Sequence, residues 1–243
     1  MATKKSSLRE RLQKRREDLK RSGPGKFFTC KEGITRVRIL PVGEENEWGL
    51  EVTYFYLGLK DNMALISPAT FNEKCAVMDA YTKLSSSKDP ADREFAKKFK
   101  PSRRFMAPVI KYKDDNGKEI DTESGVKLLL MSGGVYQEAI DLYLDDDNGD
   151  FTDPINGYDL KIKRTGKGKL DTEYKVLTGK VSKLAKEYRA EVDLEKMVRE
   201  IIPTYKETKV ILEEFLNLPE KEDDEEKEAP KKKTSKKKRS KDL

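Results

Sequence analysis

Cationic and aromatic side chains that could bind a nucleic acid recur within the range Lys100–Val181. Lys161 and Lys163 alternate with apolar residues, so a strand over this run has one apolar face and one cationic face. A loop of Gly and Lys at 165–169 follows, and Tyr174 opens the next strand-like run. Cations can follow the phosphates of a single strand while aromatic rings stack on its bases. The stretch therefore predicts a small β-barrel that binds single-stranded nucleic acid.

The sequence shows no organised set of catalytic residues. The sequence contains no histidine and two cysteines, Cys30 and Cys75, which excludes His-based catalysis and most zinc sites. The Gly-Lys run at 166–169 lacks the frame of a phosphate-binding P-loop. The acidic run Asp145–Asp150 resembles part of a calcium loop but lacks the glutamate that an EF-hand needs, and the other acids form no ordered cluster for a metal-dependent nuclease. We expect a binding protein and not an enzyme, with no metal and no cofactor.

Charge is distributed unevenly along the 243 residues, of which 40% are charged and 35% hydrophobic, with a net charge of +6. Residues 1–26 hold ten Lys/Arg and three Asp/Glu, and residues 220–243 hold ten and eight, so residues 27–219 sum to −3. A nucleic-acid site on the core must therefore be a local patch. No signal peptide and no apolar run of membrane-spanning length is found, so we expect a soluble intracellular protein without a membrane partner.

Short runs rich in aromatic and β-branched residues predict strands, and apolar residues at helical spacing predict helices. The expected strands are Lys26–Lys31, Gly33–Leu40, Trp48–Leu59, Arg104–Lys113, Val126–Met131, Tyr158–Thr165 and Thr172–Val181. The expected helices are 71–86, Pro90–Phe99, Gly133–Leu144, 184–189, 192–202 and Tyr205–Leu218. This order predicts a mainly β core at 26–219 with a helical insertion at about 63–100.

Both ends of the chain are charged and poor in apolar residues. We expect residues 1–25 to form a basic arm with a helix over 3–21. This arm would either stay solvated or dock on something acidic, such as the core of another copy. Residues 220–243 are first acidic and then basic, and we expect this tail to be disordered.

Two strands carry further candidates for ligand contact. In the run Ile34–Leu40 the side chains of Arg36 and Arg38 share one face, and we expect them at the polar surface of the domain. Tyr54 and Tyr56 share a face of an aromatic-rich strand. Most of the aromatic residues there are expected in the core, which makes these two tyrosines secondary candidates.

The order of several motifs resembles the helix-destabilising single-stranded-DNA-binding proteins of T-even and related tailed phages. Val37–Pro41 (VRILP) resembles the family's first core strand, and Arg104–Ile110 (RFMAPVI) falls where the family has an aromatic strand. Tyr136–Ile140 falls on a helix that starts with Trp in the family, and Gly157–Lys163 (GYDLKIK) resembles its penultimate core strand. The resemblance covers roughly residues 4–215.

This resemblance implies an OB-fold, a five-stranded Greek-key barrel, with an inserted helical subdomain and flexible charged termini. It implies cooperative, sequence-tolerant binding of single-stranded DNA during phage DNA replication, recombination and repair in the cytoplasm of the infected host. The segment Lys4, Lys5, Ser6 and Ser7 resembles the family's basic motif that docks on a neighbouring subunit. The family's tail recruits phage replication and recombination proteins, so these are possible partners.

The sequence also departs from the family. T-even members bind zinc through His and a Cys-x-x-Cys pair, whereas here Cys75 has Met78 as its counterpart. We expect no zinc, and packing of Phe71 and Tyr81 with Cys75 and Met78 in its place. The family's Tyr-Trp pair is replaced by Phe105–Met106, which leaves one stacking ring.

The expected DNA contacts combine cations for phosphates with rings for bases. The phosphate contacts are Arg36, Arg38, Arg103, Arg104, Lys111, Lys161, Lys163, Arg164, Lys167 and Lys169. The stacking residues are Phe105, Tyr112, Tyr136 and Tyr174, with Tyr54 and Tyr56 next. The alternative is a nuclear or RNA-associated interaction protein that uses the basic tract 231–239. If residues 1–219 alone still bind single strands, the DNA-binding interpretation is favoured over this alternative.

Overall fold

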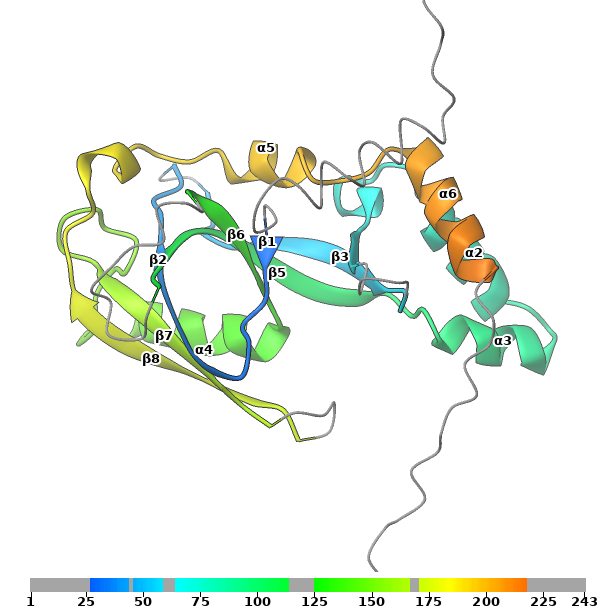
Figure 1. Cartoon of the computed structure of the whole chain (residues 1–243), viewed down its shortest axis with the longest axis horizontal. Coiled ribbons are helices and arrows are strands. Elements are labelled where there is room, and N and C mark those ends of the chain that lie inside the picture. The colour runs from blue at the N-terminus through cyan, green and yellow to red at the C-terminus, as the bar shows by residue number, and fades with distance from the viewer. Residues whose placement is uncertain (1–26, 44–45, 59–63, 114–124, 167–170, 218–243) are drawn as a thin grey trace, which may run out of the picture.

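The computed structural model describes residues 27–43, 46–58, 64–113, 125–166 and 171–217, and its main feature is a mixed β-sheet (Figure 1). The strands are β1 (Phe27–Phe28), β2 (Gly33–Ile39), β3 (Leu50–Tyr56), β4 (Ala64–Ile66), β5 (Ser102–Lys111), β6 (Lys127–Met131), β7 (Tyr158–Thr165) and β8 (Glu173–Val181). The α-helices are α2 (Ala76–Ser85), α3 (Pro90–Lys97), α4 (Gly133–Leu144), α5 (Leu194–Arg199) and α6 (Tyr205–Leu216), with 3-10 helices η1 (Pro68–Phe71) and η3 (Lys186–Tyr188). The expected mainly β fold with added helices is confirmed.

Strand β5 joins two parts of this sheet. The strands follow the order β1-β6-β5-β2-β7-β8, which we call the curved sheet, and all neighbours are antiparallel except β1 and β6. The first half of β5 pairs with β3, which also pairs with β4, whereas the end of β5 pairs with β2. The β3–β4 pair therefore extends from the curved sheet toward α2 and α3 (Figure 1).

Successive side chains along each strand of the curved sheet point to opposite faces, so the sheet has an inner face and an outer face. The inner face supplies a core that includes Val37 of β2, Val109 of β5 and Ile162 of β7, and α4 adds Val135 and Ala139. A second cluster on the opposite face of β5 and β6 is covered by α5. Within the described residues, no helix has the length and apolarity that crossing a membrane requires.

Helix α6 completes a helical unit that we define as α2, α3 and α6. Phe215 of α6 lies 5.1 Å from Phe99 and 6.0 Å from Phe95, measured between ring centroids. The buried Thr208 Oγ1 of α6 accepts a hydrogen bond from the backbone N–H of Ala76 at 3.1 Å. That N–H is in the first turn of α2 and has no partner within its own helix, so α6 caps α2 from 132 residues away in the sequence.

The segment before α2 differs from the expected helix over 71–86. Ser67 and Pro68 instead start η1, and Asn72 ends it in the left-handed region with φ 58°. Phe71 consequently packs with the cluster under α5, where the guanidinium of Arg199 lies 3.8 Å from its ring centroid. Of the four residues expected to pack together, Cys75, Met78 and Tyr81 share the core of the helical unit, and Phe71 does not.

The capping bond of α6 can be tested by replacing Thr208 with Val, which keeps the shape and removes the acceptor. We expect a loss of about 1–3 kcal/mol in the free energy of unfolding, because the Ala76 N–H stays buried without a partner. Chemical denaturation measures this, with the exposed Glu214→Ala as control on the same helix. A Thr208→Val protein as stable as the control would show that the bond does not hold α2 and α6 together.

Candidate nucleic-acid interface

A buried carboxylate, Asp159 of β7, joins three other parts of the sheet. Its Oδ2 accepts a hydrogen bond from Arg36 Nε of β2 at 2.9 Å. Its Oδ1 accepts from the hydroxyl of Tyr112, just after β5, at 3.0 Å and from Ser182 Oγ, just after β8, at 3.1 Å. Burial is the main cause that raises the pKa of Tyr112, and the neighbouring Asp159 carboxylate adds to it. Arg36, Tyr112 and Ser182 therefore bind a buried carboxylate inside the protein.

The expectation that Arg36 and Arg38 lie at the surface is wrong. Arg38 is 0% exposed; its Nη2 donates to the carbonyl of Asp153 at 2.6 Å, and its Nε and Nη1 have no hydrogen-bond partner among the described residues. Burial accordingly lowers the pKa of Arg38. The physical reason is that the chain after β8 crosses this face, where Leu184 packs on Leu40 and beside β5. Neither arginine is placed to contact a phosphate.

Three of the expected stacking rings are also engaged inside the protein. Phe105 of β5 and Tyr136 of α4 are stacked on each other, with centroids 4.0 Å apart and planes at 10°. Tyr136 is buried and its hydroxyl lies 3.4 Å from the carbonyl oxygen of Gly49, and burial raises its pKa to about 12. A Cβ at Gly49 would lie 2.2 Å from the Tyr136 ring, so only glycine fits there. Tyr112 is buried too. The expectation that Tyr112 and Tyr136 stack on DNA bases is therefore wrong, because both are buried and have structural roles. Phe105 has one face of its ring covered by Tyr136.

Other expected residues meet around Cys30, in an arrangement that we call the mouth cluster. Lys111 Nζ lies 5.4 Å from the ring centroid of Phe28, and the guanidinium of Arg164 lies 6.0 Å from that of Tyr174. Arg164 Nη1 donates to the carbonyl of Cys30 at 3.2 Å. Burial raises the pKa of the Cys30 thiol to about 11, although Lys111 and Arg164 both act to lower it. Two cations, each beside a half-buried ring, thus lie at one end of the curved sheet.

Neither Phe28 nor Cys30 was among the residues expected to contact DNA. The signal available was weak, because Phe28 belongs to a two-residue strand that pairs in parallel with β6. Sequence alone does not say that this strand brings a ring next to Lys111.

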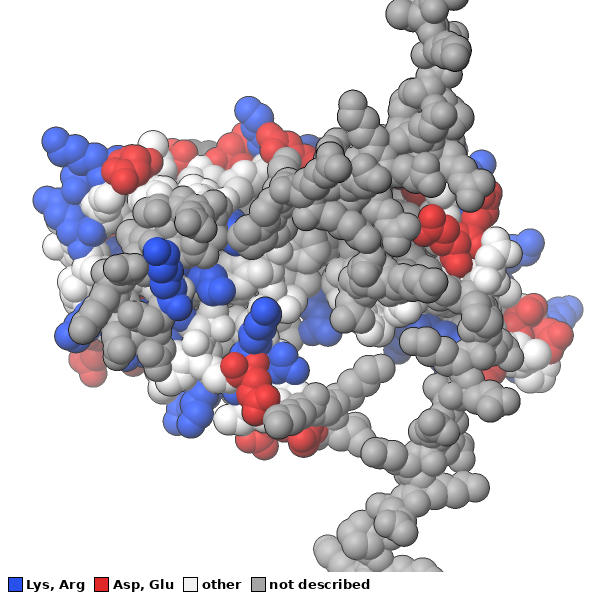
Figure 2. Space-filling model, in the orientation of Figure 1, with Lys and Arg blue, Asp and Glu red and all other residues white. Residues whose placement is uncertain are grey.

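The outer face of β2, β7 and β8 carries exposed lysines between apolar residues, and we call it the outer strip. In register across the three strands lie Ile34, Lys163 and Lys175, and Leu177 pairs with Lys161 in the next row. Ile34 is 44% exposed and Leu177 is 38% exposed. Figure 2 shows Lys and Arg side chains spread over the curved-sheet side of the molecule, on the left. The net charge of −3 over residues 27–219 is compatible with this patch because the charge is local.

A third set of expected residues lies where β3 and β5 leave the curved sheet. The guanidinium of Arg104 is 5.6 Å from the ring centroid of Tyr54, and the neighbouring Tyr56 is 45% exposed. Arg103 is exposed and lies 3.4 Å from a carboxylate oxygen of Glu51, a pair of little energetic weight in solvent. The remaining expected contacts, Lys167, Lys169, Lys4, Lys5, Ser6 and Ser7, fall outside the described residues.

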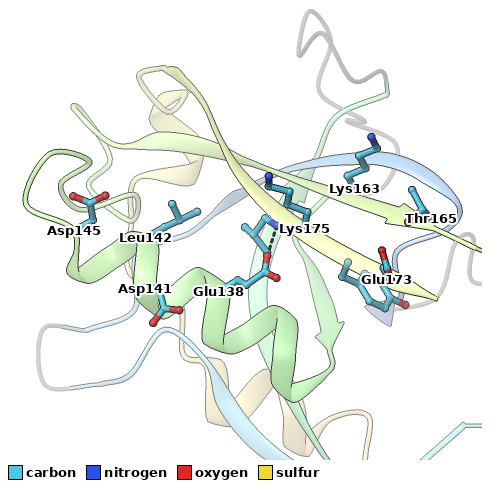
Figure 3. Close-up of a pocket in the computed structure, with 10 residues that line it drawn as sticks. Glu138, Asp141, Leu142, Asp145, Lys163, Thr165, Glu173 and Lys175 are labelled. Atoms are coloured by element: carbon cyan, nitrogen blue, oxygen red, sulfur yellow. Dashed lines mark hydrogen bonds between the residues drawn. The ribbon is translucent and has the colours of Figure 1, made fainter. Parts of the chain in front are cut away.

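A groove of about 640 Å³ lies between α4 and the β7–β8 hairpin (Figure 3). Lys163 and Lys175 line it from the strands, Glu138 and Asp141 line it from α4, and Tyr174 belongs to both the groove and the mouth cluster. The helix supplies an acidic wall, whereas the side chains of Lys163 and Lys175 extend from the strands away from α4, on the side of the outer strip (Figure 3). Among the described residues no group of three His, Cys, Asp or Glu side chains is arranged to hold a metal.

The structural role of Asp159 is tested by Asp159→Asn, which leaves Arg36 buried beside a neutral amide. We expect the free energy of unfolding to fall by about 3–5 kcal/mol, the usual cost of breaking a buried ion pair on one side. Asp141→Asn, at an exposed carboxylate, should change it by less than about 0.5 kcal/mol. Equal stability of the two variants in urea denaturation would contradict this account of Asp159.

The sequence matches the model of a known protein family. A model of the family described as gp32 DNA binding protein like matches residues 31–237. A search of curated proteins finds no match to the chain. The matched range contains the Asp159 contacts, the outer strip and most of the mouth cluster. The expected resemblance is confirmed, and the chain belongs to the gp32 DNA-binding-protein-like family.

Proposed function

We propose that this protein binds single-stranded DNA cooperatively and with little sequence preference, without catalysing a reaction. The observation that carries the proposal is the mouth cluster, where Lys111 and Arg164 lie beside the rings of Phe28 and Tyr174. A ring next to a cation can accept a base while the cation neutralises the adjoining phosphate. In this proposal the curved sheet is the OB-type barrel with Greek-key connections.

The proposed path of the strand runs from the mouth cluster over the outer strip. Lys163 of β7 and Lys175 of β8 are exposed and lie side by side on the same face of the sheet, so they can contact successive phosphates. Arg104 with Tyr54 offers a second contact of the same kind farther along β5. Because every base has a π-face and every nucleotide a phosphate, such contacts do not select a sequence.

We also propose a role in phage DNA replication, recombination and repair, in the cytoplasm of an infected host cell; the family match itself supports the DNA-binding part of this proposal. The basic arm at 1–25 would dock on a neighbouring copy, using Lys4, Lys5, Ser6 and Ser7. The acidic block at 220–228 would compete for the arm or the DNA path by Coulomb attraction, which salt weakens. Phage replication and recombination proteins are proposed partners of the tail.

Two kinds of variant separate stacking from phosphate contact. Tyr174→Ala should weaken binding of oligo-dT by about 1–3 kcal/mol with little change in salt dependence, because a ring and no charge is removed. Lys163→Ala should reduce the slope of log K against log salt by about 0.7. The controls are Tyr205→Ala on α6 and Lys97→Ala on α3, exposed residues in the helical unit. If Tyr174→Ala and Lys163→Ala bind like their controls, the strand does not follow this path.

Cooperativity is tested by comparing residues 1–243 with residues 22–243. If the arm docks on a neighbour, its removal should weaken binding to long oligo-dT and hardly affect a strand that holds one protein. If the arm instead contacts DNA, both strands should lose affinity alike. Fluorescence titration of short and long oligo-dT measures this, and equal losses would overturn the docking role.

A further inference from the structure

The free edge of β8, the last strand of the curved sheet, is bonded by a side chain of α4. Among the described residues β8 pairs with β7 alone, so its outer edge carries backbone N–H groups without a strand partner. One of them, the N–H of Val176, donates to Glu138 Oε2 of α4 at 2.6 Å. The dashed line in Figure 3 shows this bond crossing from the helix to the strand. A bond to an ionised carboxylate is shorter and stronger than one between neutral groups.

Helix α4 offers Glu138 a fixed support. Ser132 caps the start of the helix, its Oγ accepting from the N–H of Val135 at 3.4 Å. Two residues before Glu138, the ring of Tyr136 is stacked on Phe105 and lies 4.8 Å from Trp48. The helix is therefore anchored to the core within one turn of Glu138.

The strand segment held in this way carries interface residues. Val176 is buried in the core, Lys175 beside it is exposed on the outer strip, and Tyr174 two residues earlier lies under the guanidinium of Arg164. The sheet pairs Tyr174 with Arg164 and Lys175 with Lys163. A fixed backbone at Val176 therefore holds both the ring of Tyr174 and the ammonium group of Lys175 in position.

We propose that Glu138 is a positioning residue for the DNA interface: it holds the edge of β8 so that Tyr174 and Lys175 keep their places opposite Arg164 and Lys163. The inference rests on the proposed function for its DNA part. If the Glu138 charge instead acted directly on DNA, it would weaken binding, because a carboxylate near lysines that contact phosphates repels the DNA. The two roles therefore predict opposite effects when the side chain is removed.

The test compares Glu138→Ala, Glu138→Gln and Asp141→Ala in the full chain. Asp141 is the matched control, since it lies on the same wall of the groove and its carboxylate has no bond to β8 among the described residues. We expect Glu138→Ala to bind oligo-dT roughly 5- to 10-fold more weakly, the equivalent of one lost hydrogen bond. Glu138→Gln keeps an acceptor and should bind within about twofold of the wild type. Asp141→Ala should bind as well as the wild type or more tightly.

A second measurement distinguishes positioning from a general loss of stability. In a Tyr174→Ala background, Glu138→Ala should lose most of its effect on DNA binding, because the ring it positions is already gone. Amide hydrogen exchange should speed up at Tyr174, Lys175 and Val176 in Glu138→Ala and not in Asp141→Ala.

Tighter binding by Glu138→Ala, as for Asp141→Ala, or unchanged exchange along β8 overturns this inference alone. A wild-type protein that does not bind oligo-dT overturns the proposed function instead, while faster exchange in Glu138→Ala would still show that the glutamate holds the strand.

Discussion

The buried carboxylate of Asp159 is the interaction on which the curved sheet depends. It accepts hydrogen bonds from Arg36 of β2, from Tyr112 after β5 and from Ser182 after β8, so one side chain of β7 contacts residues on or next to three other strands. A charge in this position is tolerated because its oxygens are satisfied by a cation and two hydroxyls. Since side chains alternate along a strand, Asp159 shares its face of β7 with Lys161 and Lys163.

The same face is therefore divided along its length. Near Asp159 it is covered by the chain after β8, where Leu184 packs, and charges there are paired internally. Toward the hairpin it is open, and Lys163 and Lys175 lie between the exposed Ile34 and Leu177. On the inner side, Phe105 and Tyr136 hold α4 against the sheet, and α4 in turn bonds to the edge of β8. Core contacts thus decide which cations and rings remain available to a ligand.

Local pattern was enough to predict most of the elements, although not β4 or the 3-10 helix η1, and long-range contacts decided the roles of individual residues. Alternation predicted β7 and β8 with the cationic face of Lys161 and Lys163, and helical spacing predicted α4. The same alternation placed Arg36 and Arg38 on a polar face, but their burial depends on Asp159 and on the covering segment, more than 100 residues away in the sequence. The stack of Phe105 on Tyr136 likewise joins a strand to a later helix. The contacts of Lys167, Lys169 and the arm stay predictions.

The central claim is that cations beside rings on a curved sheet bind a flexible single strand in preference to a stiff duplex. The most direct measurement is the affinity of the full chain for oligo-dT and for a duplex of the same length, each at two salt concentrations. The account predicts tighter binding of oligo-dT at both concentrations, with affinity that falls as salt rises, because bases reach the rings only when they are unpaired. Equal affinity for the duplex, or binding to oligo-dT that does not respond to salt, would contradict it.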